Sequence, residues 1–347
     1  MGMKVLVTGG LGFIGSNFIR RALAETKDEI VNLDAETYAG NPENLADLLP
    51  HPRYRFLRGD ISDPETVRQA MEGVQAVAHF AAETHVDRSI LDPEAFLKTN
   101  VLGTHVLLEE ARRRAGEIKR FLHISTDEVY GPVLRGKSSE DAPFRPTSPY
   151  AASKAAADHL ATAYHKTYGL PVVIARPSNN FGPYQYPEKA LPLMITNWSE
   201  GKPFPLYGDG GQVRNWIYVH DCVRALDLIL RKGSPGRSYN VGGSVLLRNR
   251  DLVLKMRKVM GIPKSLVRQV PDRPGHDRRY ALDSRALSKL GYRPASDPAS
   301  DFDRALRETA AWYQSRRSWW RPLKQSPVFS AYYREQYAEK TKEAAAR

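Results

Sequence analysis

Short apolar runs alternate with amphipathic stretches along the first half of this chain of 347 residues. The stretches between the runs, of which 148–169 is the longest, have the length and the end residues typical of helices. Strands that alternate with such helices predict right-handed crossovers and a mostly parallel sheet. We therefore predict an α/β fold, a doubly wound parallel sheet with a smaller, irregular C-terminal lobe. Six runs have the composition of strands: residues 4–10, 29–34, 53–61, 74–82, 120–125 and 171–178.

The pattern changes after Pro177, where Pro, Gly, Asn and Tyr residues cluster as far as Asp209. A strand and helix at 215–233 and a strand at 237–243 return to the first pattern, and the later helical segments indicate a less regular lobe. The chain closes on a polar, helix-prone stretch. The predicted organisation is a sheet domain from 1–177 and 215–243, a second lobe from 178–214 and 244–330, and a polar tail over 331–347.

The chain carries a formal net charge of +12, which favours anionic ligands. Its basic residues are scattered rather than gathered into a long run with aromatic residues, so we expect no nucleic-acid partner. No apolar run approaches the roughly 18 residues of a membrane span, and we expect no membrane partner. Cys222 is the only cysteine, which excludes an internal disulfide and a cysteine-rich zinc site and predicts a reducing, cytoplasmic location. We expect no metal site.

The stretch TGGLGFIG places Gly9, Gly12 and Gly15 between the first predicted strand and the first predicted helix. Glycine allows a tight turn and a close approach of the backbone to phosphate, and a helix N-terminus stabilises the negative charge. Asp34 ends the next strand about 20 residues on, where a carboxylate binds ribose hydroxyls and repels a 2′-phosphate. The pattern indicates a Rossmann-type site for NAD rather than NADP, against the alternative of a plain glycine-rich turn. Asp60 ends the third strand and is a weaker candidate, which either meets the adenine or caps a turn.

Tyr150 and Lys154 lie four residues apart in SPYAASK, which puts both side chains on one face of a helix. A tyrosine pKa of about 10 is too high for a base at neutral pH, but a neighbouring ammonium and a nicotinamide cation both favour the phenolate. Tyr150 is then a candidate to accept a proton from a substrate hydroxyl while hydride leaves the same carbon. The spacing alone is common on helix surfaces, so the interpretation depends on the dinucleotide motif that precedes it.

Two adjacent acids, Asp127 and Glu128, follow the apolar strand RFLHI in the stretch STDEVYG. A charge beside an apolar core costs several kcal/mol unless it is compensated. The pair either caps a turn or carries out acid–base chemistry, and the pattern by itself leaves both interpretations open.

Five stretches together resemble the extended short-chain dehydrogenases/reductases and, more narrowly, the dTDP-glucose 4,6-dehydratases: TGGLGFIG, AAETHVDRSI, STDEVYG, YAASK and SNNFGPYQYPEKALP. The likeness runs from about Lys4 to Trp320, and STDEVYG is its most specific element. Extended reductases that only epimerise C4 usually have no acid pair at Asp127 and Glu128, so the resemblance favours chemistry over capping. It implies an NAD-dependent hydro-lyase that converts dTDP-glucose to dTDP-4-keto-6-deoxyglucose and water, a step of deoxysugar biosynthesis.

The resemblance also implies a role for each catalytic residue. Tyr150, assisted by Lys154, takes the proton of the 4-hydroxyl while hydride passes from C4 to NAD, and Thr126 hydrogen-bonds near that hydroxyl. Glu128 then removes the C5 proton, Asp127 protonates the departing 6-hydroxyl, and the hydride returns to C6. Asp127 must therefore be protonated at working pH, and its charged neighbour is expected to raise its pKa.

Binding contacts are implied at the positions that match the family. Tyr207 is expected to flank the pyrimidine, Arg214 to hold the diphosphate, and His85 with Asp87 to shape the sugar pocket. Turn amides, a helix cap at Asn249 and a solvated arginine loop are the structural alternatives. Cofactor contacts are expected from Gly9, Gly12, Phe13, Ile14, Gly15, Asp34, Asp60, Ile61, Ala81, Thr99, Tyr150 and Lys154. Substrate contacts are expected from His85, Asn179, Asn180, Glu188, Lys189, Pro205, Tyr207, Arg214, Asn249, Arg273 and His276.

Other functions stay open beside this one. A UDP-sugar 4,6-dehydratase would differ only in a few loop contacts to the base, and a 4-epimerase of the same fold would use only Tyr150 and NAD. A catalytically silent NAD-binding scaffold would need neither the tyrosine nor the acids. Besides the nucleotide diphosphate sugar we expect a second copy of the chain as partner, because in this fold helices such as 101–115 and 150–168 commonly pair into a four-helix bundle.

Overall fold

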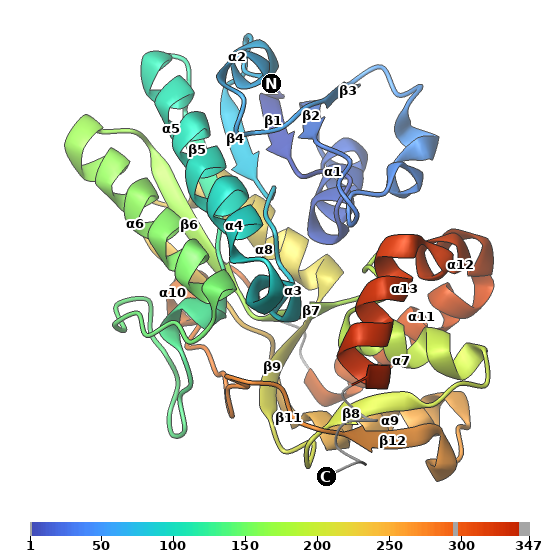
Figure 1. Cartoon of the computed structure of the whole chain (residues 1–347). Coiled ribbons are helices and arrows are strands. Elements are labelled where there is room, and N and C mark those ends of the chain that lie inside the picture. Colours follow the sequence, from blue (N-terminus) through green and yellow to red (C-terminus); the bar gives the residue numbers. More distant parts are fainter. Residues whose placement is uncertain (1, 294–297, 340–347) are drawn as a thin grey trace.

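A seven-stranded parallel sheet forms the centre of the computed structural model, which describes residues 2–293 and 298–339 (Figure 1). Its strand order is β10-β6-β5-β4-β1-β2-β3, and every neighbouring pair is parallel. The chain thus builds outward from β1 in both directions, which confirms the predicted doubly wound α/β fold. The strands of this sheet are β1 (Lys4–Thr8), β2 (Glu29–Asp34), β3 (Tyr54–Arg58), β4 (Ala76–His79), β5 (Arg120–Ile124), β6 (Val172–Pro177) and β10 (Ser238–Val241).

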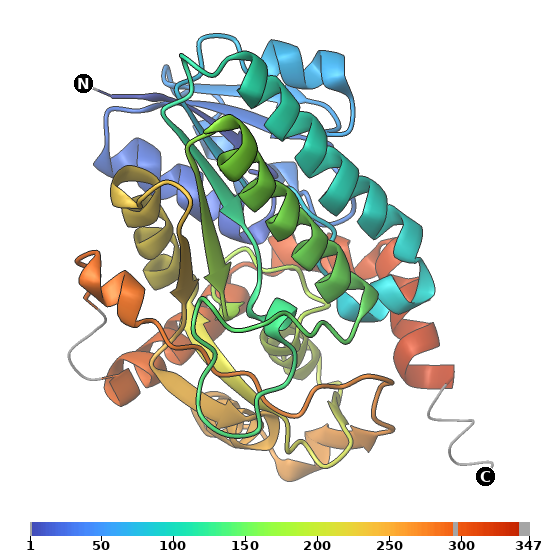
Figure 2. The ribbon, with the colours of Figure 1, turned by 90° about the vertical axis from the view of Figure 1, so that its left-hand side faces the viewer.

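Alternating side chains divide the apolar core between the two faces of the sheet. Val5 and Val7 of β1 pack in one cluster with α1 (Phe13–Glu25) and α8 (Val219–Lys232). Leu6, which lies between them, packs in a second cluster with helices on the other face. Figure 2 shows α5 and α6 on one side of the sheet and α1 and α8 on the other. The helices of the second cluster are α2 (Pro64–Ala70), α5 (Thr104–Arg113) and α6 (Pro149–Tyr168).

Helix α6 matches its predicted span of 148–169 because both of its ends are encoded locally. Ser148 accepts a hydrogen bond from the Ala151 amide (3.1 Å) at the first turn, and Gly169 ends the helix in the left-handed conformation. The helix expected over 101–115 begins differently, since residues Leu97–Gly103 (η3) are π-helical and α5 follows them. Short helices α3 (Val86–Leu91) and α4 (Pro93–Phe96) precede this segment.

A second lobe packs its own apolar core around Tyr313, Trp320 and Phe181, all fully buried. It contains a three-stranded sheet in the order β11-β9-β7 and a two-stranded sheet of β8 and β12. The strands are β7 (Asn179–Phe181), β8 (Phe204–Tyr207), β9 (Val213–Tyr218), β11 (Val245–Arg248) and β12 (Val267–Val270). The helices are α7 (Ala190–Ser199), α9 (Asn249–Met260), α11 (Pro298–Ser315), α12 (Arg317–Gln325), α13 (Pro327–Tyr333) and η6 (Arg334–Glu339), while α10 (Arg285–Lys289) lies beside β10.

The division into two domains stays our proposal, and the pairing of the strands suggests where its boundaries belong. Strand β9, which the prediction assigned mostly to the sheet domain, pairs with β7 and β11 and so joins the sheet of the second lobe. Residues 331–339, predicted as part of a polar tail, are helical, and Tyr332 and Tyr337 are buried in the core of the lobe. Residues 340–347 of that predicted tail lie outside the described part of the chain. Within 2–293 and 298–339, no helix combines the length and apolar composition needed to cross a bilayer.

Candidate functional site

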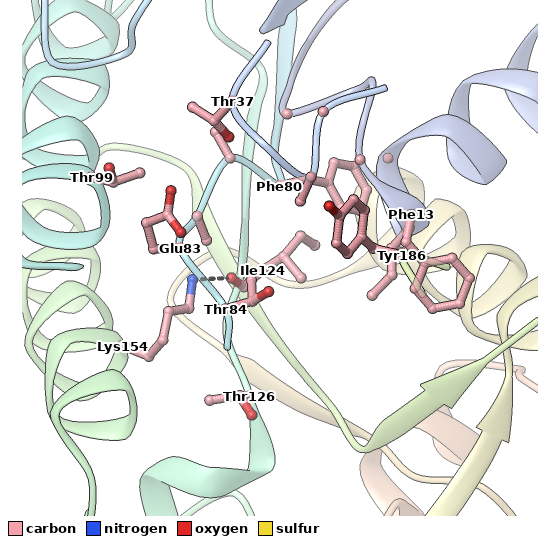
Figure 3. Close-up of a pocket in the computed structure, with 18 of the residues that line it drawn as sticks. Phe13, Thr37, Phe80, Glu83, Thr84, Thr99, Ile124, Thr126, Lys154 and Tyr186 are labelled. Atoms are coloured by element: carbon pink, nitrogen blue, oxygen red, sulfur yellow. Dashed lines mark hydrogen bonds between the residues drawn. The ribbon is translucent and has the colours of Figure 1, made fainter. Parts of the chain in front are cut away.

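A cavity of about 320 Å³ lies where the carboxyl ends of the parallel strands face the second lobe. The strand ends of this fold are where ligands bind, and the volume falls in the range of small-molecule sites. All residues predicted to hold the cofactor or to act in catalysis line this cavity, including the glycine turn, Asp34, the acid pair, Tyr150 and Lys154. Figure 3 shows how Lys154, Thr126 and Glu83 come to it from one side and Phe13, Phe80 and Tyr186 from the other.

The glycine turn between β1 and α1 leaves room that any side chain would fill. Gly9 adopts a positive φ of 70°, and a Cβ there would lie 2.5 Å from the Ala81 amide nitrogen. A Cβ on Gly15 would lie 2.4 Å from the carbonyl oxygen of Gly9. Gly12 forms the N-cap of α1, so the free amides of the first turn point toward the cavity. The backbone therefore fits a pyrophosphate at a helix N-terminus, as a dinucleotide requires.

Asp34 holds the shape of the turn from the end of β2. Its carboxylate accepts hydrogen bonds from the amides of Leu11 and Glu36, each at 2.9 Å. The side chain is buried, and this burial raises its pKa despite the two bonds. Asp60 lies at the end of β3, accepts from the Ser62 amide (2.8 Å) and pairs with Lys98. Both acids line the cavity, where a carboxylate can reach a ribose or an adenine.

The acid pair sits in a short turn, η4 (Asp127–Tyr130), that directly follows β5. Thr126 caps this turn by accepting a hydrogen bond from the Glu128 amide (3.2 Å), so the threonine and not the acids makes the cap. Asp127 is 3% exposed, and its Oδ2 has no hydrogen-bond partner among the described residues. Burial, with a smaller contribution from Glu128, raises the pKa of Asp127 to about 8. This carboxyl is therefore set to hold a proton near neutral pH.

The pKa of Glu128 is also shifted by burial, but more cations oppose the shift than at Asp127. Burial raises its pKa, while Arg273, Arg214 and Lys189 act in the opposite direction. The three cations come from three separate segments of the second lobe and its connections. Two neighbouring carboxyls in one cavity thus differ in their surroundings, which separates a proton donor from a proton acceptor.

Tyr150 and Lys154 extend from the first two turns of α6, both almost fully buried. The Lys154 ammonium donates to the carbonyl oxygen of Ile124 at 2.6 Å (Figure 3). Burial lowers the pKa of Lys154 to about 8, and Asp158 acts in the opposite direction. Burial also raises the pKa of Tyr150, with Glu128 adding to the shift and a hydrogen bond from Thr126 opposing it. Deprotonation of Tyr150 near neutral pH therefore requires positive charge in addition to that of Lys154.

Four of the predicted substrate residues also line the cavity: Asn179, Asn180, Glu188 and Lys189. Glu188 is buried and ion-paired with Arg88, whose Nε lies 3.0 Å from its carboxylate. The Tyr38 hydroxyl donates to the same carboxylate at 3.0 Å. Lys189 donates to the Thr84 carbonyl oxygen at 3.1 Å. The 188–189 pair is thus built into the wall of the cavity rather than into a free loop.

The other seven predicted substrate residues do not line this cavity, and their roles stay predictions. Arg214 is buried with its guanidinium 4.5 Å from the ring centroid of Tyr280, and Asn249 begins α9, whose N-cap is its neighbour Arg248. Pro205 lies within β8. Three others surround one buried carboxylate, Asp87: His85, Tyr207 and Arg273. The last, His276, packs its ring against Tyr207, with the ring centroids 5.8 Å apart.

Several cavity residues were missed by the sequence analysis. Thr37 gives no signal, because it belongs to an irregular segment that only the tertiary fold brings to the strand ends. Tyr186 belongs to the SNNFGPYQYPEKALP stretch and could have been proposed from it. Glu83 and Thr84 belong to the AAETHVDRSI stretch and could have been proposed from it. Glu83 is held by the Asn100 side chain, which accepts from its amide (2.9 Å) and donates to its carbonyl oxygen (3.0 Å).

Comparisons with known proteins agree with this geometry. The family model described as GDP-mannose 4,6 dehydratase matches residues 6–308. A dTDP-glucose 4,6-dehydratase of Streptomyces niveus is 48% identical over 328 residues, covering 93% of this chain and 96% of the relative. One of Streptomyces griseus is 49% identical over 327 residues, covering 93% and 98%. The crystal structure of the dTDP-glucose 4,6-dehydratase DesIV of Streptomyces venezuelae, with NAD bound, superposes with a TM-score of 0.89 at 48% identity, covering 93% of this chain and 100% of that one.

We expect Gly15→Ala to weaken NAD binding about 5- to 150-fold, because overpacking against the backbone of Gly9 costs about 1–3 kcal/mol. The measurement is calorimetric titration of the chain with NAD after removal of any co-purified nucleotide. Gly116→Ala is the matched control, because nothing lies within 4 Å of a Cβ at that position. Equal NAD affinity in both variants would contradict the assignment of this turn.

Proposed function

The chain belongs to the GDP-mannose 4,6-dehydratase family of nucleotide-sugar enzymes, and from this membership we propose that it is an NAD-dependent dTDP-glucose 4,6-dehydratase. The reaction converts dTDP-glucose to dTDP-4-keto-6-deoxyglucose and water. When bound, NAD supplies an acceptor for the C4 hydride and later returns that hydride to C6. The residues of this chain bind and orient the sugar and move the protons.

The observation that carries the proposal is the acid pair placed in the same cavity as Tyr150 and Lys154. A 4-epimerase needs the tyrosine and the cofactor but has no proton transfers at C5 and at the 6-hydroxyl. Asp127 and Glu128 supply two such groups, and burial leaves one of them protonated near neutral pH. The acid pair therefore favours elimination of water over epimerisation.

Oxidation at C4 depends on Tyr150 in its deprotonated form. Lys154 is held beside the end of β5 by its bond to the Ile124 carbonyl oxygen, which keeps its ammonium next to the reaction centre. Thr126 hydrogen-bonds Tyr150 and lowers the pKa of its phenol, which burial raises. We assign Tyr150 as the base for the 4-hydroxyl, with Lys154 and Thr126 lowering the cost of its charge.

Elimination uses the two carboxyls in opposite protonation states. The 4-ketone acidifies the C5 hydrogen, and Glu128, stabilised as an anion by Arg273, Arg214 and Lys189, is assigned as its acceptor. Asp127 is assigned as the donor to the departing 6-hydroxyl, because its unpartnered Oδ2 and raised pKa suit a protonated carboxyl. Water then leaves with the Asp127 proton, and Glu128 gives its proton back to C5 when the hydride returns to C6.

We also propose that the enzyme works in the cytoplasm as a homodimer joined through α5 and α6. The outer side of this helix pair exposes Tyr168 (52%), and the adjoining turn of η3 exposes Leu97 (57%) and Leu102 (48%). A second copy packed on these helices would cover this apolar surface. Light scattering of the purified chain should give the mass of two chains, and Leu102→Glu should shift it toward one.

Purified enzyme supplied with dTDP-glucose should form a product lighter by one water, with the alkali-induced absorbance of a 4-keto-6-deoxy sugar. UDP-glucose should have a kcat/KM at least about tenfold lower than that of dTDP-glucose. A loss of about 1.4 kcal/mol of contacts to the base is enough for a tenfold difference. Product mass and initial rates on both nucleotides are the measurement. If neither dTDP-glucose nor UDP-glucose gives product, the dehydratase proposal is wrong. A preference for UDP-glucose would show that the nucleotide base is uracil rather than thymine.

Asp127→Asn should retain C4 oxidation but slow elimination about 100-fold or more, the usual scale of a lost general acid. The amide keeps the shape of the carboxyl but cannot protonate the leaving hydroxyl. Single-turnover absorbance of the bound cofactor should show its reduced form accumulating in the variant and not in the parent enzyme.

Asp141→Asn is the control, since that carboxyl is exposed and outside the cavity. The pH dependence gives a second check of the same assignment. A carboxyl with its pKa raised to about 8 is protonated below that value, so elimination should slow as the pH rises through about 8. An elimination rate of the parent enzyme that rises across that interval would show that another group is the acid.

A further inference from the structure

Four segments that are far apart in the sequence meet at the carboxylate of Asp87, which is 4% exposed. Its Oδ2 accepts hydrogen bonds from the hydroxyls of Tyr207 and Tyr332, both at 3.0 Å. Its Oδ1 accepts from Arg273 Nη1 at 2.7 Å. Asp87 belongs to α3 beside the large sheet, whereas its three donors belong to β8, the loop after β12 and α13 of the second lobe.

Burial of the charged Asp87 carboxylate costs free energy unless these hydrogen-bond donors are in place. Burial would raise the pKa of its carboxyl, but His85, Arg273 and the Tyr332 hydroxyl lower it to about 2. The group is therefore a buried anion that depends on its hydrogen bonds. Since Arg273 and Tyr207 share this one acceptor, a change in any donor affects the position of the others.

Tyr332 connects the C-terminal helices to the wall of the cavity in two further ways. Its ring lies 5.1 Å from the His85 ring and 4.9 Å from the guanidinium of Arg88. Arg88 in turn holds the cavity residue Glu188. The next turn along the chain adds Gln336, whose amide donates to the Tyr207 hydroxyl at 2.6 Å.

Arg273 is the member of this group that is able to bind an anion. Its Nη1 is fixed by Asp87, while its buried Nε has no hydrogen-bond partner among the described residues. A guanidinium that is fixed through one nitrogen and free at another is preorganised for a phosphate oxygen. This arrangement fits the substrate contact expected of Arg273.

We propose that Tyr332 is a positioning residue for the nucleotide diphosphate of the substrate, acting through Asp87 on Arg273 and Tyr207. The inference rests on the proposed function for the identity of the substrate. Tyr332 itself does not line the cavity and is not a catalytic residue. The C-terminal helix α13 is then part of the substrate site, although it lies about 200 residues from the acid pair in the sequence.

The test compares Tyr332→Phe with Tyr333→Phe, which removes the next hydroxyl on the same helix. The Tyr333 hydroxyl accepts from Asn197 (3.2 Å) and not from the Asp87 cluster, so the pair is closely matched. Tyr332→Phe should raise the KM for dTDP-glucose and the Kd for dTDP about fivefold, the scale of one ordinary hydrogen bond, because Tyr332 acts on the nucleotide only through Asp87. Its kcat and its affinity for NAD should stay within about twofold of the parent. Tyr333→Phe should match the parent in all four quantities.

Asp87→Asn provides a second variant, which should weaken dTDP binding more than Tyr332→Phe because it also releases Arg273. Equal KM and Kd for the two tyrosine variants would overturn the proposal. So would a parallel fall in kcat, NAD affinity and melting temperature in Tyr332→Phe, since that pattern reports a structural role alone. Calorimetric titration with dTDP needs no turnover, so it tests Tyr332 even if the parent enzyme fails to convert dTDP-glucose, a failure that would count against the proposed function instead.

Discussion

One hydrogen bond, from the Lys154 ammonium to the Ile124 carbonyl oxygen, connects the two elements on which the site depends. It fixes α6 against the end of β5, where the chain turns into the acid pair. Tyr150 lies one helical turn before Lys154, and Asp127 lies three residues after Ile124. The proposed base for C4 and the proposed acid for the 6-hydroxyl are thus held to one another through two rigid elements rather than through a loop. Precision of this kind is needed where one sugar must meet several proton-transfer groups in turn.

Electrostatics in the cavity follow from an uneven distribution of cations around buried acids. Glu128 faces Arg273, Arg214 and Lys189, whereas Arg214 is the cation that opposes the shift of Asp127. Sequence reasoning attributed the raised pKa of Asp127 to its charged neighbour, but burial is the larger cause. The difference is physical, because neighbours in sequence are visible in the chain and exclusion from solvent is a property of the fold. The same reason explains why burial of Tyr150 was not anticipated.

How much the sequence predicted depended on how local each signal is. The strands of the large sheet, helix α6 and the glycine turn are encoded within about 10–20 residues by periodicity, caps and glycine, and the structure has all of them close to the predicted bounds. The π-helical segment before α5 has no such signal, since its geometry accompanies a side chain, Asn100, that bonds Glu83 and Ser153 elsewhere. Tyr332 is the extreme case. Polar residues around it gave the appearance of a tail, and its role emerges only where α13 meets α3.

The cluster at Asp87 joins the two lobes in a different way from the apolar cores that hold each lobe together. Each has its own apolar core, with one cluster on each face of the large sheet and another around Trp320, whereas the cluster at Asp87 between them is polar and charged. Apolar contacts are non-directional, so they would tolerate small shifts between the lobes. Charged hydrogen bonds depend steeply on distance and angle, and they are also the groups that a diphosphate can recruit. We therefore expect the carboxylate of Asp87, which fixes an arginine of the second lobe, to set the alignment of the two lobes before substrate arrives, and to make that alignment sensitive to the negative charge of the nucleotide.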